Sequence, residues 1–222
     1  RMPLINFHTH LTSQKEGEVR IVSLNVEEVD NIESLSMVTV GVHPWQTDSN
    51  NMEDLLAKFH ELIRHPNVIG IGEVGLDRLR GGSLTLQAKY LREQAIAAAS
   101  ISKPVVIHCV RAWSELVETL SAPDLKQLTK AIHGFRGKAD LARQLVDRNY
   151  YLSFGSILVD PSPELAESLT VIPKNRLFFE TDTSEMPIGE IYSAAADILD
   201  TSVDELTLQV ENNLNTFFGF NG

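Results

Sequence analysis

The sequence predicts an α/β fold, a TIM-type (β/α)8 barrel that is somewhat reduced because its first helix is short or missing. Short β-rich runs alternate with helical patterns from end to end of the chain, which is typical of βα units and a parallel sheet. Residue types that bind metals stand at the carboxyl ends of several runs, where such a barrel places its active site. A doubly wound sheet would show the same alternation, and the placement of the polar residues favours the barrel.

Eight runs have the composition of buried strands: Leu4–His8, Arg20–Leu24, Met37–Val42, Val68–Glu73, Pro104–His108, Ala131–His133, Tyr150–Phe154 and Arg176–Thr181. The segment 9–19 is barely long enough for a parallel crossover, which normally needs about a dozen residues that include a helix. The first helix is therefore expected to be missing or vestigial.

Apolar residues spaced three and four positions apart mark the helices between the strands, as over 52–63. Ser49 or Asn50 is expected to cap this helix. Ser202 followed by Glu205 predicts a capping box at the start of a C-terminal helix.

Length and composition indicate one ordinary globular domain. We expect a single domain over 1–222, because one barrel can occupy 222 residues. Hydrophobic residues make up 43% of the chain and charged residues 22%, close to ordinary soluble usage. The formal net charge of −11 argues against a surface that coats duplex nucleic acid or an anionic membrane. We expect a monomer.

Cysteine usage favours a reducing compartment, because Cys109 is the only cysteine and no intramolecular disulfide can form. No apolar stretch approaches the roughly 18 residues that suggest a membrane span. The N-terminus lacks the layout of a signal peptide. We therefore expect a cytoplasmic protein that does not bind membranes.

Six residues of metal-binding types stand at or beside strand ends. His8 and His10 form an H-x-H pair at the end of the first run, and strand alternation points both side chains toward the same side. The fourth, fifth and sixth runs end at Glu73, His108 and His133, and Asp182 follows the eighth run. Each alone is more often structural than a ligand, but six at strand ends are hard to attribute to chance.

This set suits borderline divalent ions such as Zn²⁺, Mn²⁺ or Ni²⁺, and the number of ligands fits two ions better than one. His60 and His65 fall on or after a helix, away from any strand end, so we interpret them as surface residues. Cys109 follows His108 and should point to the opposite side, which favours packing over catalysis.

The motifs and their order resemble those of the TatD family of metal-dependent hydrolases, within the amidohydrolase superfamily. The matching segments are Phe7–His10, Gly41–Pro44, Ile71–Asp77, Lys103–His108, His133–Gly137 and Glu180–Asp182. The resemblance therefore runs from the first strand to the last. Its most specific motifs are Gly-Glu-x-Gly-Leu-Asp and Glu-Thr-Asp.

The resemblance implies a site for two divalent ions (Zn²⁺, Mn²⁺, Ni²⁺ or Mg²⁺). Glu73 would bridge the ions, His8, His10 and Asp182 would hold one, and His108 and His133 would hold the other. It also implies that Asp182 and Glu73 are catalytic, with Asp182 as the base. The implied reaction is hydrolysis of phosphodiester bonds by a metal-activated water, as in a deoxyribonuclease.

The chain departs from the family pattern in three ways. It is shorter than is usual for the family, chiefly by a reduced connection between its first two strands. Thr183–Pro187 replaces the proline-containing continuation after Glu-Thr-Asp, so the shape of the substrate cleft does not carry over. Arg78–Arg80 replaces aromatic residues after Gly-Leu-Asp, so contacts to a base or leaving group do not carry over there.

Basic residues after strand ends favour a phosphate-containing substrate. They are Arg78, Arg80, Arg111, Arg136 and Lys138. We predict that His43, Arg111 and Arg136 contact a small phosphodiester or single-stranded DNA. Trp45 is a candidate to stack on a base, and packing on a loop is an equal alternative.

Two alternative functions remain open. The first is an amidohydrolase that acts on an amide or ester bond, like a deacylase or lactonase. The second is a non-catalytic metal-binding barrel, against which the intact ligand set weighs. No dinucleotide fingerprint and no phosphate-binding loop occurs in the sequence.

Overall fold

The computed structural model describes residues 2–30 and 32–220. Its contacts divide the chain into two compact units, described one at a time below: unit 1 is Arg1–Val22 with Ala131–Gly222, and unit 2 is Ser23–Lys130. The predicted single domain over 1–222 stays a prediction.

All eight predicted strands are present, β7 with the predicted bounds and the others with at least one shifted end: β1 Leu4–Thr9, β2 Glu18–Asn25, β3 Val38–Gly41, β4 Val68–Asp77, β5 Val105–Val110, β6 Lys130–Ile132, β7 Tyr150–Phe154 and β8 Leu177–Phe179. Their order in the sheet is their order in the chain. The α-helices are α1 Met52–Leu62, α2 Leu84–Ser100, α3 Trp113–Leu120, α4 Ala139–Val146, α5 Pro163–Thr170, α6 Ile188–Ile198 and α7 Val203–Phe218.

The barrel pattern is reduced more than the sequence predicts. Residues 10–17, between β1 and β2, contain no helix, as expected. Between β2 and β3 the described residues form only a short 3₁₀ helix, Ile32–Ser34. Two crossovers therefore lack an α-helix in the described part of the chain.

Several predicted element ends differ from the structure. Strand β4 continues to Asp77, so Glu73 lies within the strand and not at its end. His108 likewise lies inside β5. The cap of α1 is Asn51, not Ser49 or Asn50. The predicted capping box of Ser202 and Glu205 is confirmed at the start of α7.

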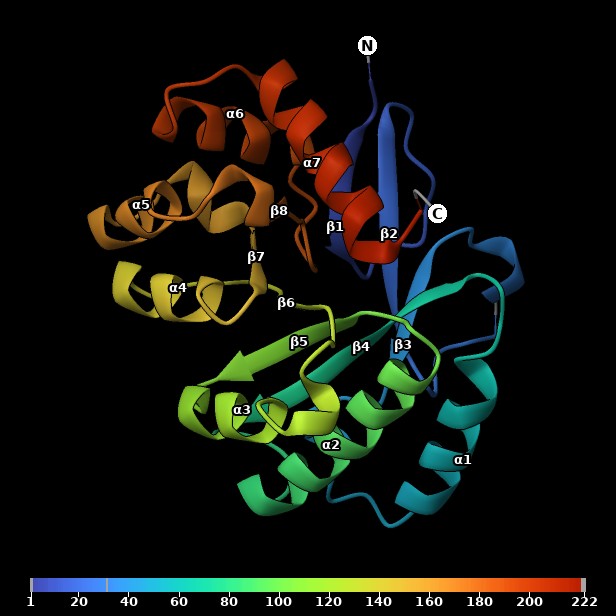
Figure 1. Ribbon diagram of the computed structural model, residues 1–222. Coiled ribbons are helices and arrows are strands. Elements are labelled where there is room, and N and C mark those ends of the chain that lie inside the picture. The colour runs from blue at the N-terminus through green and yellow to red at the C-terminus, as the bar shows by residue number, and fades with distance from the viewer. Residues whose placement is uncertain (1, 31, 221–222) are drawn as a thin grey trace. The chain divides into compact units, whose positions relative to one another are not determined.

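In unit 2, the parallel strands β3, β4 and β5 lie side by side, and α2 packs on β4 (Figure 1). Two glutamines that lie two turns apart on α2, Gln87 and Gln94, are each 1% exposed. The Gln87 side chain accepts from the Asp77 N–H at 2.7 Å and donates to the Asp77 carbonyl at 2.9 Å. Gln94 accepts from the Val42 N–H at 2.7 Å and donates to the Val42 carbonyl at 3.2 Å. These bonds satisfy backbone groups that the ends of two strands leave buried.

In unit 1, β1 joins β8 through buried polar contacts. Asn6, fully buried, donates to the Thr181 hydroxyl at 2.8 Å and accepts from the Thr181 N–H at 3.0 Å. Phe7 of β1 also stacks on Phe178 of β8 with ring centroids 4.0 Å apart, and Phe217 of α7 meets the Phe7 ring edge-on. The segment after β8 is thereby fixed against β1.

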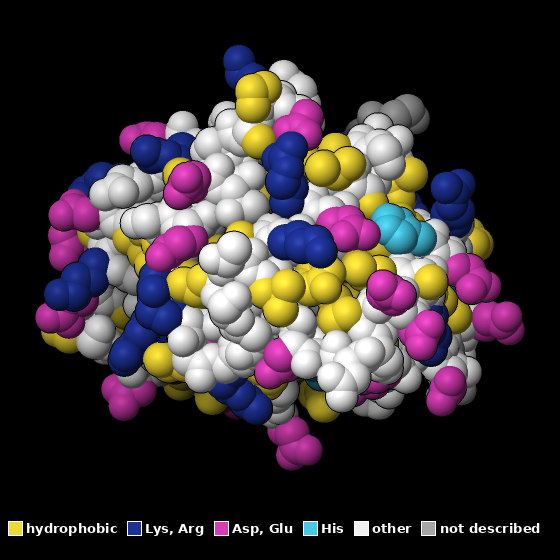
Figure 2. Space-filling model, turned by 90° about the horizontal axis from the view of Figure 1, so that it is seen from below, with side chains coloured by type: hydrophobic (Ala, Val, Ile, Leu, Met, Phe, Trp, Pro, Cys, Tyr) yellow, Lys and Arg dark blue, Asp and Glu magenta, His cyan; other side chains and the backbone are white. Residues whose placement is uncertain are grey.

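Among the described residues, no helix is both long and apolar enough to cross a membrane. On the face drawn in Figure 2, acidic and basic side chains are interspersed. The described side chains visible there form no continuous basic patch.

The close approach of β4 to β5 leads to a stability prediction. Gly75 has φ of +145°, and a Cβ there would lie 1.8 Å from the His108 carbonyl oxygen. Gly75→Ala should therefore lower the free energy of unfolding by more than about 2 kcal/mol, or prevent folding. Urea unfolding measures this, with Gly189→Ala as control, because a Cβ at Gly189 meets only Leu4 at 3.5 Å. Equal midpoints for Gly75→Ala and the wild type would contradict the prediction.

Candidate metal centre

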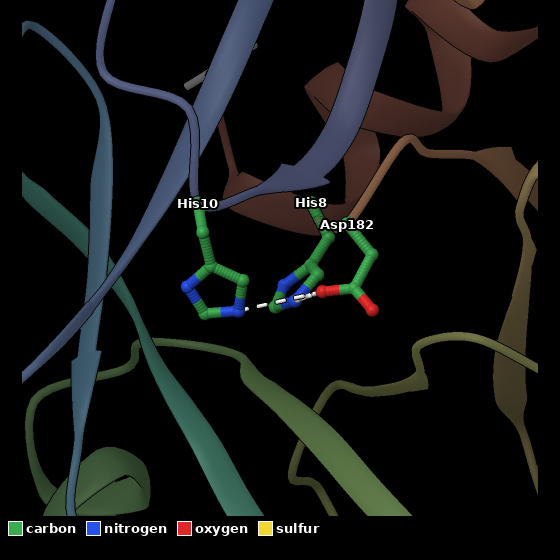
Figure 3. A group of neighbouring side chains, drawn as sticks. All are labelled: His8, His10 and Asp182. Atoms are coloured by element: carbon green, nitrogen blue, oxygen red, sulfur yellow. Dashed lines mark ion pairs between the residues drawn. The ribbon is translucent and has the colours of Figure 1, made fainter. Parts of the chain in front are cut away.

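Unit 1 brings His8, His10 and Asp182 together (Figure 3). The Asp182 Oδ1 atom lies 3.6 Å from His8 Nε2 and 3.4 Å from His10 Nε2. His8 is 1% exposed, whereas the side chains of His10 and Asp182 are about one third exposed or more. Both histidines point to the same carboxylate, so the predicted common side of the H-x-H pair is confirmed.

The backbone holds Asp182 in a strained conformation. Its φ is +53°, in the left-handed region that non-glycine residues rarely adopt. The Asp182 N–H donates to the His8 carbonyl at 3.0 Å, and the Asp182 carbonyl accepts from the His10 N–H at 3.1 Å and from the Thr9 hydroxyl at 3.2 Å. Such strain persists where surrounding contacts enforce it, which is typical of functional sites.

Asp182 is held in its ionised form. Burial by itself raises the pKa of this carboxyl, but hydrogen bonds from the His10 and His8 side chains, together with the electrostatic effect of His8 and His133, lower it more strongly. The net pKa lies well below its ordinary value. A carboxylate beside two imidazoles is the kind of donor set that binds divalent ions.

His133 also belongs to this part of unit 1. Its ring stacks on that of His8 with centroids 4.1 Å apart. His133 Nδ1 lies 3.2 Å from Oε1 of Glu180, whose side chain is fully buried. A buried carboxylate behind an imidazole is the usual way in which proteins orient a histidine ligand.

Unit 2 gathers Glu73, His108 and His43. Glu73 is 7% exposed, and its Oε2 atom lies 3.7 Å from His108 Nδ1 and 3.3 Å from His43 Nε2. The donor atoms of these three side chains all lie within 4.8 Å of one another, as do those of His8, His10 and Asp182. Each unit therefore contains a donor set that fits a divalent ion.

Behind this second cluster lies Asp77, which is 3% exposed. Its carboxylate accepts from Trp45 Nε1 at 2.7 Å and from the Leu79 N–H at 2.9 Å, and lies 3.0 Å from His108 Nε2. Burial by itself raises the pKa of the Asp77 carboxyl, but the bonds from Trp45, His108 and Leu79 outweigh it and the pKa is lowered. Asp77 is thus a fixed hydrogen-bond acceptor.

Four of the five basic residues that follow strand ends divide into two kinds, and the second kind comprises the two arginines predicted to contact substrate, Arg111 and Arg136. Arg78 forms an ion pair with Glu115 and donates to the Arg111 carbonyl, and Arg80 stacks 3.6 Å above the Trp45 ring. Arg111 and Arg136 are exposed, and neither guanidinium makes an ion pair with a residue that the structure describes. Only the second kind keeps its charge available for a ligand.

A cavity of about 100 Å³ lies beside Asp182 in unit 1. Its lining includes Arg136, Asp182 and the hydroxyl-bearing residues Ser156, Thr183 and Ser184. The departure from the family pattern at 183–187 thus contributes two residues, Thr183 and Ser184, to the lining.

Cys109 and His65 are half-buried and His60 is exposed, so the surface interpretation is confirmed for His60. Burial raises the pKa of the Cys109 thiol to about 12, so it is un-ionised at neutral pH. The His60 side chain is 48% exposed and lies 3.6 Å from Glu93.

Sequence reasoning missed Asp77 and Glu180. Both stand inside the two most specific motifs, Gly-Leu-Asp and Glu-Thr-Asp. The available signal was a carboxylate within a run of otherwise apolar strand residues, because a buried carboxylate requires a partner.

The cluster in unit 1 predicts how metal binding responds to mutation. His10→Ala removes one of three donor groups and should weaken binding of Zn²⁺ or Mn²⁺ more than the roughly 10- to 100-fold expected for loss of a supporting residue. His60→Ala, which changes an exposed helical histidine, should leave the affinity unchanged. Calorimetric titration of the metal-free protein measures both. Equal affinities of His10→Ala and the wild type would exclude His10 as a ligand.

Comparison with known proteins identifies the family. The model of the family described as TatD related DNase matches residues 9–219. Among curated proteins, the uncharacterized metal-dependent hydrolase YabD of Bacillus subtilis is 33% identical over 159 residues, 71% of this chain and 60% of that protein. The 3'-5' ssDNA/RNA exonuclease TatD of Cronobacter turicensis is 35% identical over 148 residues, 65% of this chain and 56% of that protein. The chain thus matches less than two thirds of the length of either relative.

Among solved structures, the TatD homolog YJJV of Escherichia coli K12 matches with a TM-score of 0.85 at 22% identity, over 97% of this chain and 98% of that chain. This similarity confirms the (β/α)8 fold class predicted from the sequence. The match of the family model over 9–219 establishes that the chain belongs to the TatD related DNase family.

Proposed function

We propose that this chain is a divalent-metal-dependent hydrolase that cleaves phosphodiester bonds in single-stranded DNA or a small phosphodiester. The observation that carries the proposal is the ionised Asp182 carboxylate, which faces His8 and His10 and lines a cavity that Arg136 also lines. The name of the Cronobacter relative, a 3'-5' ssDNA/RNA exonuclease, supports the substrate class.

We propose that two ions bind, drawn from Zn²⁺, Mn²⁺, Ni²⁺ and Mg²⁺. His8, His10 and Asp182 would hold one, and Glu73 with His108 would hold the other. When bound, such ions lower the pKa of a coordinated water and neutralise charge on a phosphoryl oxygen. Two further assignments remain predictions from the sequence: Glu73 bridges both ions, and His133 binds the second ion.

Asp182 and Glu73 are the proposed catalytic residues. Because its pKa lies below the ordinary value, Asp182 is unprotonated at neutral pH, as a group that receives a proton from the attacking water must be. It can then return this proton to the leaving oxygen, a role that requires a carboxylate within hydrogen-bond reach. Glu73, nearly buried, contributes negative charge that favours cation binding.

His43, Arg111 and Arg136 are the proposed substrate-binding residues. Arg136 lines the cavity beside Asp182, where its guanidinium can pair with a phosphate oxygen. Arg111 follows β5 and has a strained φ of +51°, as Asp182 does after β8. Every phosphodiester carries a negative charge at the bond that is cleaved, whereas an ester or amide bond is neutral, so the exposed arginines favour phosphodiesters.

We also propose that the protein is a monomer in the cytoplasm. The lone Cys109 supports a reducing compartment.

A substrate panel tests the proposed reaction. The wild type with added Zn²⁺ or Mn²⁺ should hydrolyse single-stranded DNA and a chromogenic phosphodiester, but not matched ester and amide substrates. Asp182→Asn should fold and lose at least about 100-fold in turnover, the lower range for general acid–base catalysis. Hydrolysis of the acyl substrates alone would indicate an amidohydrolase. Absence of turnover across the panel, with metal bound, would indicate a non-catalytic barrel.

The two exposed arginines should determine the affinity for anionic substrates. Arg136→Ala and Arg111→Ala should each raise KM for single-stranded DNA about 10-fold or more, because a hydrogen bond to a charged group contributes about 1.5–3 kcal/mol. Arg64→Ala, which changes an exposed arginine after α1, serves as the matched control. Unchanged KM in both variants would remove these residues from the substrate site.

A further inference from the structure

The two histidines in unit 2 that face Glu73 are held in opposite ways. His43 approaches the Glu73 carboxylate with Nε2 and His108 approaches it with Nδ1. A neutral imidazole has one nitrogen that carries hydrogen and one that offers a lone pair, and the bond made by the far nitrogen decides which is which. The far nitrogens of these two rings have different partners.

His43 uses its far nitrogen as an acceptor. It caps the 3₁₀ helix Pro44–Gln46, and its Nδ1 accepts from the Trp45 backbone N–H at 3.2 Å. Proline has no N–H, so Trp45 is the first residue of this turn that can donate. The lone pair of Nδ1 is therefore occupied and Nε2 carries the hydrogen. At 3.3 Å from Glu73 Oε2, His43 Nε2 is a donor, and a nitrogen that carries hydrogen does not bind a metal.

His108 uses its far nitrogen as a donor. Its Nε2 lies 3.0 Å from Asp77 Oδ2, and an ionised carboxylate only accepts hydrogen bonds. Nε2 therefore carries the hydrogen and the lone pair is on Nδ1. His108 Nδ1 lies 3.7 Å from Glu73 Oε2, beyond hydrogen-bond distance but suited to two groups that share a cation.

Hydrogen bonds keep the Asp77 carboxylate in position as the acceptor for His108. The same Oδ2 atom accepts from Trp45 Nε1, Oδ1 accepts from the Leu79 N–H, and Gln87 holds the Asp77 backbone on both sides. The carboxylate is 3% exposed, so it cannot turn toward solvent without losing these bonds. Its position and its acceptor role are thus fixed before any ligand binds.

We propose that Asp77 is a positioning residue that makes His108 a metal ligand through Nδ1, whereas His43 is a hydrogen-bond donor and not a ligand. This inference rests on the proposed function. In the substrate complex, His43 Nε2–H is placed to donate to a negatively charged oxygen. Side-chain distance alone groups His43, Glu73 and His108 as one donor set, and only the hydrogen bonds behind the rings separate them.

The His43 assignment is tested with a matched pair of variants. His43→Asn keeps a polar atom near the position of Nδ1 for the cap but loses the group at Nε2, and His43→Gln restores a donor near Nε2. Zn²⁺ titration of the metal-free protein should give wild-type affinity for both variants, with kcat/KM reduced in His43→Asn and partly restored in His43→Gln. If His43→Asn loses metal affinity as severely as His108→Ala, then His43 is a ligand and the inference is wrong.

The Asp77 assignment is tested in the same titration. Asp77→Asn should weaken Zn²⁺ binding about 10- to 100-fold, as expected for loss of the partner of a histidine ligand. Trp45→Phe removes the other side-chain donor to Asp77 but leaves the His108 contact, so its Zn²⁺ affinity should equal that of the wild type. Equal losses in both variants would indicate general disruption of the site and would overturn the positioning role.

Nitrogen-15 NMR of the metal-free protein supplies a readout independent of activity. In the wild type, both His43 and His108 should carry hydrogen on Nε2, and Asp77→Asn should mix the two forms of His108 only. Metal binding together with hydrogen on His108 Nδ1 would overturn this inference alone. A wild-type protein that binds no divalent ion would overturn the proposed function and the ligand assignment with it.

Discussion

Polar groups buried at the ends of the strands must be hydrogen bonded, and this requirement positions the candidate site. In unit 2 the α2 glutamines Gln87 and Gln94 bind the backbone of Asp77 and Val42, the residue before His43. In unit 1 Asn6 binds Thr181, the residue before Asp182. Gln94 and Asn6 thus each hold the residue before a proposed site residue, and Gln87 holds Asp77, which supports His108.

The same arrangement recurs around the histidines of the two units. His108 is backed by Asp77 and His133 by Glu180, and both carboxylates are almost fully buried. A buried carboxylate without a partner would cost several kcal/mol, so the ring and the acid fix each other. The candidate ligands are therefore oriented by the fold itself, which is the preorganisation that a binding site for small ions requires.

The exposed positive charges also support the candidate site. The chain carries a net charge of −11, yet the guanidinium groups of Arg111 and Arg136 remain exposed without an ion pair among the described residues. Arg78 and Arg80, by contrast, serve local structure through Glu115 and Trp45. Sequence position after a strand end did not separate these two kinds of arginine, because it says nothing about which acidic or aromatic group lies opposite.

The sequence by itself determined the (β/α)8 fold class, all eight strands and the common orientation of His8 and His10, because these follow from local periodicity and from residue types at strand ends. It also determined the capping box of Ser202 and Glu205, whose partners are three residues apart. Only the tertiary structure decided that Glu73 lies inside a strand, that Asp77 and Glu180 support histidines, and that His43 and His108 present different nitrogens to one carboxylate. These features depend on partners from distant segments, 31 residues apart for Asp77 and His108 and 47 for His133 and Glu180. Periodicity gives the face on which a side chain lies, and it does not specify the side chain that it meets there.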